Sequence, residues 1–257
     1  MRIVVVSAHF PPNFVSGGTL QPQRIARGLR DRGHDVSVYA GWLGDARAPL
    51  ETWDDIDETG LSVRWIVTTP WTGWGDDNNW DNPAVASDFK SYIAAIRPDV
   101  VHLHSLQSLG AGLIREAAGT GARVVVTMHD FWWVCARQFL VDRDLRPCCL
   151  VVDAGVCECE AGRPWLDERS SQLREMLADV DLVLAPSASA ARVLEANGVD
   201  RERLAVDENG LPSSPIPRAV PAGGATELAP GSLRLLYVGG SDELKGVRHL
   251  FASVRPL

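Results

Sequence analysis

Two glycines near the N-terminus lie where a phosphate could bind. Gly17 and Gly18 end a polar, proline-containing loop that follows the apolar run at residues 3–6 and precedes a helix expected over residues 21–32. Glycine lets the backbone approach a ligand closely, and the N–H groups at the start of a helix attract anions. A turn that merely requires positive φ is the alternative interpretation. The spacing is not the G-x-G-x-x-G fingerprint of dinucleotide enzymes.

Histidine and aspartate side chains follow expected strands further along the chain. His129-Asp130 comes directly after one apolar run, and His104 comes directly after the preceding run. Ligands of open α/β sheets bind at the carboxyl ends of the strands, so we expect these side chains at that edge. An imidazole can hydrogen-bond through either nitrogen and can change its charge near neutral pH. A core histidine with a structural partner is the alternative, and His102 is expected deeper on the same face.

Apolar, β-branched runs alternate with helix-like segments up to residue 206. This alternation predicts βαβ units and therefore an α/β fold with a Rossmann-like parallel sheet, whose ligand crevice lies at the carboxyl ends of the strands. The expected strands are residues 3–6, 36–40, 61–67, 99–103, 123–128, 181–185 and 204–206, and the expected helices are residues 21–32, 84–96, 109–118, 166–178 and 188–196.

The chain is expected to contain one complete domain and the start of another. Residues 212–232 are rich in proline, glycine, alanine and serine, which is typical of a linker between domains. Residues 233–238 form a new apolar run that reads as a buried strand, followed by Gly239-Gly240 and a helix start. We therefore expect a domain over residues 1–211 and, over residues 233–257, only the opening of a second one, which is too short to bury a core.

Composition argues against several classes of protein. A net charge of −8 does not favour a nucleic-acid partner, which requires a concentrated basic surface. The N-terminal apolar run is too short for a secretory signal, and no stretch approaches the ~18 apolar residues of a membrane-spanning helix. The five cysteines are confined to residues 135–159, which does not suggest a secreted disulfide framework. A cytoplasmic protein is therefore expected.

Taken together, these segments resemble the retaining glycosyltransferases of GT-B fold and family-4 type. The resemblance covers essentially the whole chain, and it rests on short motifs that occur in the order typical of the family. Each motif is weak alone, and the ordered series is what makes the resemblance specific. The motifs are Pro11-Pro12 with Gly17-Gly18, residues 29–36, residues 97–104, residues 127–132, Pro186-Ser187, Asn209-Gly210, and residues 237–240 with Lys245-Gly246.

The resemblance implies transfer of a sugar from a nucleotide-diphosphate sugar to a hydroxyl of a glycan, glycolipid or small-molecule acceptor, with no metal or other cofactor. Backbone amides and cationic side chains would stabilise the departing diphosphate. The resemblance assigns the donor phosphates to Gly17, Gly18 and Lys245. However, Gly240 stands where the family commonly has an arginine, so one cationic contact is missing or comes from elsewhere.

The resemblance also implies roles for the residues at the strand ends. His129 would contact the transferred sugar or the acceptor near the reaction centre, and Asp130 would orient it or bind the acceptor, so these two are the expected catalytic residues. His104 is a weaker candidate, for acceptor binding. The family's paired glutamates would fall after Leu257, so we expect the chain alone to be incapable of catalysis, or nearly so.

Three further features each allow two interpretations. The four arginines within residues 21–32 are expected to pair with local acids, with contact to an anionic membrane at its inner face as the alternative. The tryptophans of the loop 71–80 can stack on an acceptor sugar or pin the loop to the sheet. Reduced thiols are expected for the cysteines, with four thiolate ligands of a zinc ion as the alternative. Those four are Cys135, Cys148, Cys157 and Cys159.

Two other classes of function remain open at this point. One is a binding module with the Rossmann-like fold that retains affinity for an acceptor or another ligand without catalysis. The other is a nucleotide-sugar epimerase with a GT-B-like fold, against which the run His129-Asp130 and the Lys245-Gly246 motif count. An oxidoreductase that uses a dinucleotide is not favoured, because no G-x-G-x-x-G follows any expected strand.

Overall fold

The computed structural model describes the chain apart from residues 45, 70–72, 74, 154, 158–160, 211–230, 233, 241–242 and 255–257. The chain divides into two compact units, Met1–Leu211 and Pro212–Leu257. Nearly all of the expected linker, residues 212–232, lies outside the described residues.

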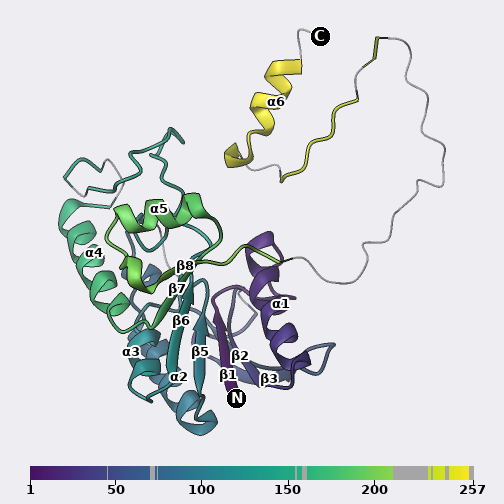
Figure 1. Ribbon diagram of the computed structural model, residues 1–257, viewed down its shortest axis with the longest axis vertical. Coiled ribbons are helices and arrows are strands. Elements are labelled where there is room, and N and C mark those ends of the chain that lie inside the picture. The colour runs from purple at the N-terminus through teal and green to yellow at the C-terminus, as the bar shows by residue number, and fades with distance from the viewer. Residues whose placement is uncertain are drawn as a thin grey trace. The chain divides into compact units, whose positions relative to one another are not determined.

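One sheet of eight strands organises the first unit (Figure 1). The strands are β1 Arg2–Ser7, β2 Asp35–Trp42, β3 Thr52–Ile56, β4 Ser62–Val67, β5 Val100–Leu103, β6 Arg123–Thr127, β7 Leu182–Ala185 and β8 Leu204–Val206. They lie in the order β3-β4-β2-β1-β5-β6-β7-β8. Every neighbouring pair is parallel except β3 with β4. The fold is therefore α/β with a mostly parallel sheet, and the predicted fold class is confirmed.

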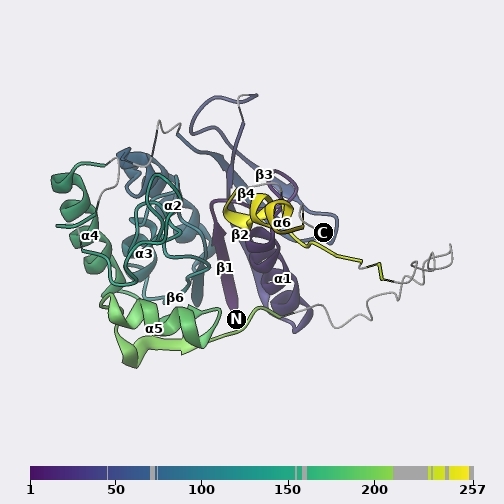
Figure 2. The same ribbon diagram turned by 90° about the horizontal axis from the view of Figure 1, so that it is seen from above.

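Helices cover both faces of this sheet (Figure 2). They are α1 Gly17–Asp31, α2 Pro83–Ile96, α3 Leu113–Ala118, α4 Arg163–Leu177 and α5 Ala188–Ala196, with single 3-10 turns η1 Asp77–Asn79 and η2 Arg201–Arg203. In β1, Val4 and Val6 join a core with α2, α3 and α4, whereas Ile3 and Val5 join a second core with α1. Burial on both faces explains why the strand is a continuous β-branched run.

Side-chain caps determine where the helices next to the site begin. The Thr19 N–H donates to the Ser16 hydroxyl at 3.3 Å, and the Ser16 N–H donates to the Thr19 hydroxyl at 2.8 Å. This reciprocal capping box starts α1 at Gly17. On α2, Asn82 is the N-cap, and Pro83 takes the first helical position, where its missing N–H costs nothing. Within the described part of the chain, no helix is both long enough and apolar enough to span a membrane.

The structure corrects three predictions of element boundaries. Strand β3 is missing from the sequence prediction, because its exposed Asp54 and Asp55 interrupt the apolar pattern; it forms the antiparallel edge by pairing with β4. Helix α1 begins at Gly17, four residues before the expected start, because of the capping box. Helix α3 begins at Leu113 instead of residue 109, since Gly110 adopts a φ of 87° that turns the chain.

In the second unit, the strand expected over residues 233–238 is not formed by the residues described. Leu235, Leu236 and Val238 are 54%, 88% and 87% exposed. A strand requires neighbouring N–H and C=O groups to pair with, and the described residues of this unit contain no other strand. The prediction of a buried strand is therefore wrong for residues 234–238. The turn η3 Glu243–Lys245 and the helix α6 Val247–Val254 follow.

Candidate functional site

The strand order reverses between β1 and β5, which is where open α/β sheets bind ligands. The loops after these two strands are joined, because the Ala8 N–H donates to the Ser105 carbonyl at 2.7 Å. His9 from the first loop lies beside Gln107 from the second. On the neighbouring strand β2, a Cβ at Gly41 would lie 2.5 Å from the Ala8 carbonyl oxygen, so only glycine lets the strand pass this loop.

Two histidines meet at the carboxyl ends of β5 and β6. His104 Nδ1 and His129 Nε2 lie 2.9 Å apart, and the two rings are stacked with their centroids 5.1 Å apart. His104 is only 1% exposed, whereas His129 is half-buried. The structure therefore brings these two predicted site residues together. Because the His104 ring is buried behind His129, a ligand that approaches this edge would contact His129 first.

A third histidine extends this group into the protein. His102 Nε2 lies 2.8 Å from Thr127 Oγ1, and the His102 ring centroid lies 4.2 Å from that of His104. Burial lowers the pKa of His102 and of His129 to about 4, and it lowers the pKa of His104 as well. All three imidazoles are therefore neutral at pH 7. The expected change of charge near neutral pH does not hold for His129, which is a hydrogen-bonding group in that range.

Asp130 faces its own loop. Its carboxylate accepts hydrogen bonds from the Trp132 N–H at 2.8 Å and from the Gln138 side-chain amide at 3.0 Å. Burial raises the pKa of this carboxyl, and the two hydrogen bonds and the Arg169 guanidinium oppose that rise. Neither bond involves His129. In this structure Asp130 therefore shapes the loop beside the histidine instead of orienting the imidazole.

A buried arginine holds the same loop from α4. Arg169 is 1% exposed, donates to the Trp132 carbonyl, and places its guanidinium carbon 5.1 Å from the centre of the Trp132 ring. The Trp132 indole in turn donates to Asn79 Oδ1 at 3.1 Å. Sequence analysis did not identify Arg169. The available signal is its position on the apolar face of α4, in register with Leu166 and Leu173.

Gly17 and Gly18 form the first turn of α1. Neither has a positive φ, so the interpretation as a turn that requires positive φ is wrong. A Cβ added at Gly17 would meet nothing within 4 Å, and one added at Gly18 would meet only Ser16 Oγ at 3.8 Å. The surface beside both residues is therefore open, and a ligand could approach the backbone closely there.

The cationic side chains singled out in the sequence have different surroundings. On α1, Arg27 is paired with Asp57 at 2.8 Å, and Arg30 donates to the Thr59 carbonyl at 2.5 Å. These contacts favour local pairing of the helix arginines, as expected. Lys245 belongs to the second unit, where it ends η3 and is exposed, so its contact with donor phosphates stays a prediction.

The cysteines lie in the insertion between β6 and α4. Cys135, Cys148 and Cys149 are free thiols, and Cys159 lies outside the described residues. No group of three His, Cys, Asp or Glu side chains that could hold a metal ion is found in the described part of the chain. The insertion is attached to α5 by the Asn197 side chain, which donates to the Leu150 carbonyl and accepts from the Val152 N–H, each at 2.7 Å.

The tryptophan loop is only partly described. Trp71 and Trp74 lie outside the described residues. Trp80 is 5% exposed and belongs to the main core, and the Trp165 indole donates to the neighbouring Asp77 carboxylate at 2.6 Å. Of the two interpretations of the loop tryptophans, Trp80 therefore fits the one in which the side chain pins the loop to the sheet.

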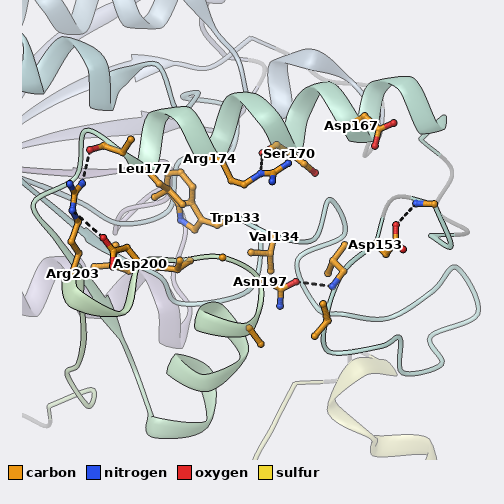
Figure 3. Close-up of a pocket in the computed structure, with 18 of the residues that line it drawn as sticks. Trp133, Val134, Asp153, Asp167, Ser170, Arg174, Leu177, Asn197, Asp200 and Arg203 are labelled. Carbon is orange, nitrogen blue, oxygen red and sulfur yellow. Dashed lines mark hydrogen bonds and ion pairs between the residues drawn. The ribbon is translucent and has the colours of Figure 1, made fainter.

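Two cavities share Trp133 as a wall. The smaller measures about 10 Å³ and is lined by His104 and His129 among others. The larger measures about 730 Å³ and lies between α4, α5 and the segment that contributes Val151, Val152, Asp153 and Gly155 (Figure 3). In the larger cavity Arg203 already donates to two backbone carbonyls, and the cavity contains none of the predicted site residues. The histidine group is therefore the better candidate site.

One histidine at this edge was missed in the sequence. His9 follows β1 in the same way that His104 follows β5 and His129 follows β6. The signal that identified the other two, a histidine just past the end of an apolar run, was thus present for His9 as well. Burial lowers the pKa of His9, so it is also neutral at pH 7.

Several solved structures resemble this chain, and in each the match covers about half of the solved chain's own length. The catalytic domain of starch synthase IV from Arabidopsis thaliana, bound to ADP and acarbose, is 15% identical, with a TM-score of 0.47 over 81% of this chain and 51% of that one. The Anabaena protein HepE in complex with UDP is 15% identical, with a TM-score of 0.46 over 82% and 44%. The UDP-GlcNAc 2-epimerase from Methanocaldococcus jannaschii is 11% identical, with a TM-score of 0.43 over 80% and 45%.

A curated relative and a family model also match the sequence. An uncharacterized 42.6 kDa protein in the cps region of Klebsiella pneumoniae is 22% identical in an alignment of 150 residues that covers 52% of this chain and 38% of the relative. The chain thus spans well under two thirds of the relatives that it matches. The model of Glycosyltransferase Family 4 matches residues 15–214, which is well over half of the chain. The chain therefore belongs to glycosyltransferase family 4.

Proposed function

We propose that this chain is the acceptor-binding half of a retaining, metal-independent glycosyltransferase, which moves a sugar from a nucleotide-diphosphate sugar to an acceptor hydroxyl. Family membership supports the class of reaction. The observation that carries the location of the site is the neutral His104–His129 pair at the carboxyl edge of the sheet, next to the reversal of strand order.

The departing diphosphate requires positive potential, since negative charge develops on it as the glycosidic bond breaks. In the proposal, the N–H groups of Gly17 and Gly18 at the start of α1 provide it. Their support is the open surface beside both residues and the capping box that aligns this first turn. Lys245 of the second unit would add a cationic contact to the same phosphates, as the resemblance implies.

His129 would contact the transferred sugar or the acceptor as a neutral imidazole. Its support is the half-buried position at the strand end and the low pKa caused by burial. A group that stays neutral from pH 7 down to about its pKa binds sugar hydroxyls by hydrogen bonds, without transferring a proton in that range. Asp130 would act by holding the loop that follows, through its bonds to Trp132 and Gln138.

The acceptor is proposed to be a glycan, a glycolipid or a small molecule with a free hydroxyl. Its binding site would be the carboxyl edge of the first unit, with His104 acting behind His129. Membrane contact through the arginines of α1 is not part of the proposal, because Arg27 and Arg30 are engaged with neighbouring groups.

The proposal is tested by titrating the isotope-labelled protein with UDP, GDP, ADP and their glucose conjugates while recording backbone amide spectra. We expect the largest shifts at the amides of Gly17 and Gly18. Gly17→Val places a side chain over the phosphate position and should weaken binding about tenfold, the value of roughly one lost hydrogen bond. Gly28→Val in the same helix is the matched control, since its Cβ approaches only the end of the Arg32 side chain, at 3.7 Å.

Two results would contradict the proposal. One is a nucleotide that shifts other amides while Gly17 and Gly18 do not respond. The other is equal loss of affinity in Gly17→Val and Gly28→Val, which would mean that the valine acts through the helix and not at the ligand. The chain alone is expected to form little or no product from a nucleotide sugar and a glycan acceptor. Transfer at a substantial rate would contradict that expectation, and the anomeric configuration of any product formed would test the retaining course.

A further inference from the structure

The His104–His129 contact fixes which nitrogen of each ring carries a proton. His104 Nδ1 and His129 Nε2 are 2.9 Å apart, and two neutral imidazoles can share such a contact only if one donates and the other accepts. We propose that His104 donates from Nδ1 and is a positioning residue, which holds His129 as the tautomer with its hydrogen on Nδ1, directed to the ligand. The identity of the ligand rests on the proposed function, whereas the assignment of the tautomer is independent of it.

The surroundings of the second nitrogen of His104 favour this assignment. His104 Nε2 is fully buried and has no hydrogen-bond partner among the described residues. If His104 accepted through Nδ1, this nitrogen would carry a buried N–H without an acceptor, which is the rarer kind of unpaired group in proteins. If His104 donates through Nδ1, Nε2 presents only a lone pair.

Both rings must be neutral for this argument, and their packing keeps them so. The His104 ring lies between His129 and His102, with ring centroids 5.1 Å and 4.2 Å away; it is stacked on His129 and tilted against His102. A proton added to any of the three rings would be poorly hydrated and would repel a charge on its neighbours. The packing therefore keeps the three imidazoles neutral, so that in the His104–His129 hydrogen bond one ring is the donor and the other is the acceptor.

The consequence concerns what His129 can bind. Among the described residues His129 Nδ1 has no hydrogen-bond partner, and it is not fully buried, so this nitrogen is open to a ligand. In the proposed tautomer it is a donor. His129 therefore recognises an oxygen lone pair, such as that of a sugar hydroxyl or a phosphate, and it does not take a proton from the acceptor through this nitrogen.

The test measures the ¹⁵N chemical shifts of the His129 ring in the ligand-free protein at neutral pH, which distinguish a protonated ring nitrogen from a bare one. His129→Gln assigns the signals. We expect a protonated Nδ1 in the wild type and in His104→Asn, whose amide can donate from near the former Nδ1 position. We expect His104→Asp, which offers an acceptor there, to move the proton of His129 to Nε2.

A matched control is His102→Gln, which retains a hydrogen-bonding side chain for Thr127 and takes no part in the hydrogen bond between His104 and His129. It should leave the tautomer of His129 unchanged. A wild-type His129 protonated on Nε2, or an unchanged tautomer in His104→Asp, would overturn the proposal. If His104→Asp fails to fold, the wild-type and His104→Asn spectra still decide it.

The same variants separate this inference from the proposed function. With nucleotide sugar as the probe, His104→Asp should bind about tenfold more weakly than wild type and His104→Asn should restore most of the affinity, as expected for one hydrogen bond. A confirmed tautomer with no binding of any nucleotide sugar would contradict the proposed function alone. A protonated Nε2 with normal binding would contradict the positioning role alone.

Discussion

Two segments of this chain share an order of sequence features and differ in structure. Each has an apolar run, then a pair of glycines, then a helix; in the first unit these are β1, Gly17-Gly18 and α1. β1 pairs with β2 on one side and with β5 on the other, and its Val5 is 0% exposed. In the second unit, the described residues of the corresponding run form no strand, and Val238 is 87% exposed.

The difference teaches that an apolar run acquires a structure from its neighbours. β-branched residues favour a pleated, half-buried surface, and that preference is realised only where other strands and helices supply it. In the first unit, adjacent strands place the helix start, the histidines and the buried arginine at one edge. The described residues of the second unit provide no such neighbours for the run before Gly239-Gly240.

The largest expected effect comes from placing a carboxylate in each run. Val5→Asp buries a charge in the core beneath α1 and should lower the free energy of unfolding by about 4 kcal/mol or more. Val238→Asp lies at an exposed position and should change it by less than about 0.5 kcal/mol. Chemical denaturation followed by circular dichroism measures both. Equal destabilisation by the two variants would remove the contrast between the runs.

A second comparison uses one arginine from each unit. Arg169→Met removes a buried guanidinium that bonds the Trp132 carbonyl and should cost about 3 kcal/mol. Arg248→Met removes an exposed partner of Glu243, 2.9 Å away, and should cost no more than about 0.5 kcal/mol. Urea unfolding of the two variants checks this. If Arg169→Met were as mild as Arg248→Met, Arg169 would not hold the loop after β6.

The most gradual effect, spread over a range of pH, is a dependence of stability on pH that belongs to the first unit. The pKa values of His102 and His129 are lowered to about 4 in the folded protein, so between pH 6.5 and 4 the unfolded chain binds more protons. The unfolding free energy should therefore fall as pH falls through this window, by at most about 1.4 kcal/mol per pH unit for each histidine. His102→Gln should have a shallower slope, since it lacks one titrating group. Identical slopes would mean that His102 does not contribute to the loss of stability at low pH.

Much of the fold could be predicted from the sequence, and the reason is burial. Strands covered on both faces, such as β1, are continuous apolar runs, and α5 carries a strong amphipathic pattern after a Ser187 cap; both were predicted nearly to the residue. The edge strand β3 was not, because its side chains are mostly exposed and its pattern resembles a loop. For residues 234–238 the prediction of a strand was wrong for the opposite reason: the composition is that of a core strand, but the described residues form none.

The candidate site could be predicted in position but not in detail. His104 and His129 follow neighbouring parallel strands, so their meeting at one edge follows from the topology. The direct bond between the rings depends on ring orientation, which no spacing in the sequence encodes. Arg169 was missed because a charge within a helix normally indicates the solvent side. The roles of His129, Asp130, Gly17, Gly18 and Lys245 remain predictions.

The attachment of the cysteine-bearing insertion to α5 has a consequence for sequence divergence. Asn197 binds the insertion through the carbonyl of Leu150 and the N–H of Val152, which are main-chain groups common to almost every amino acid. Substitutions at these two positions therefore leave both bonds available, with proline at position 152 as the exception because it has no N–H. A single asparagine thus permits the insertion to vary its side chains over generations while its anchoring point is inherited unchanged.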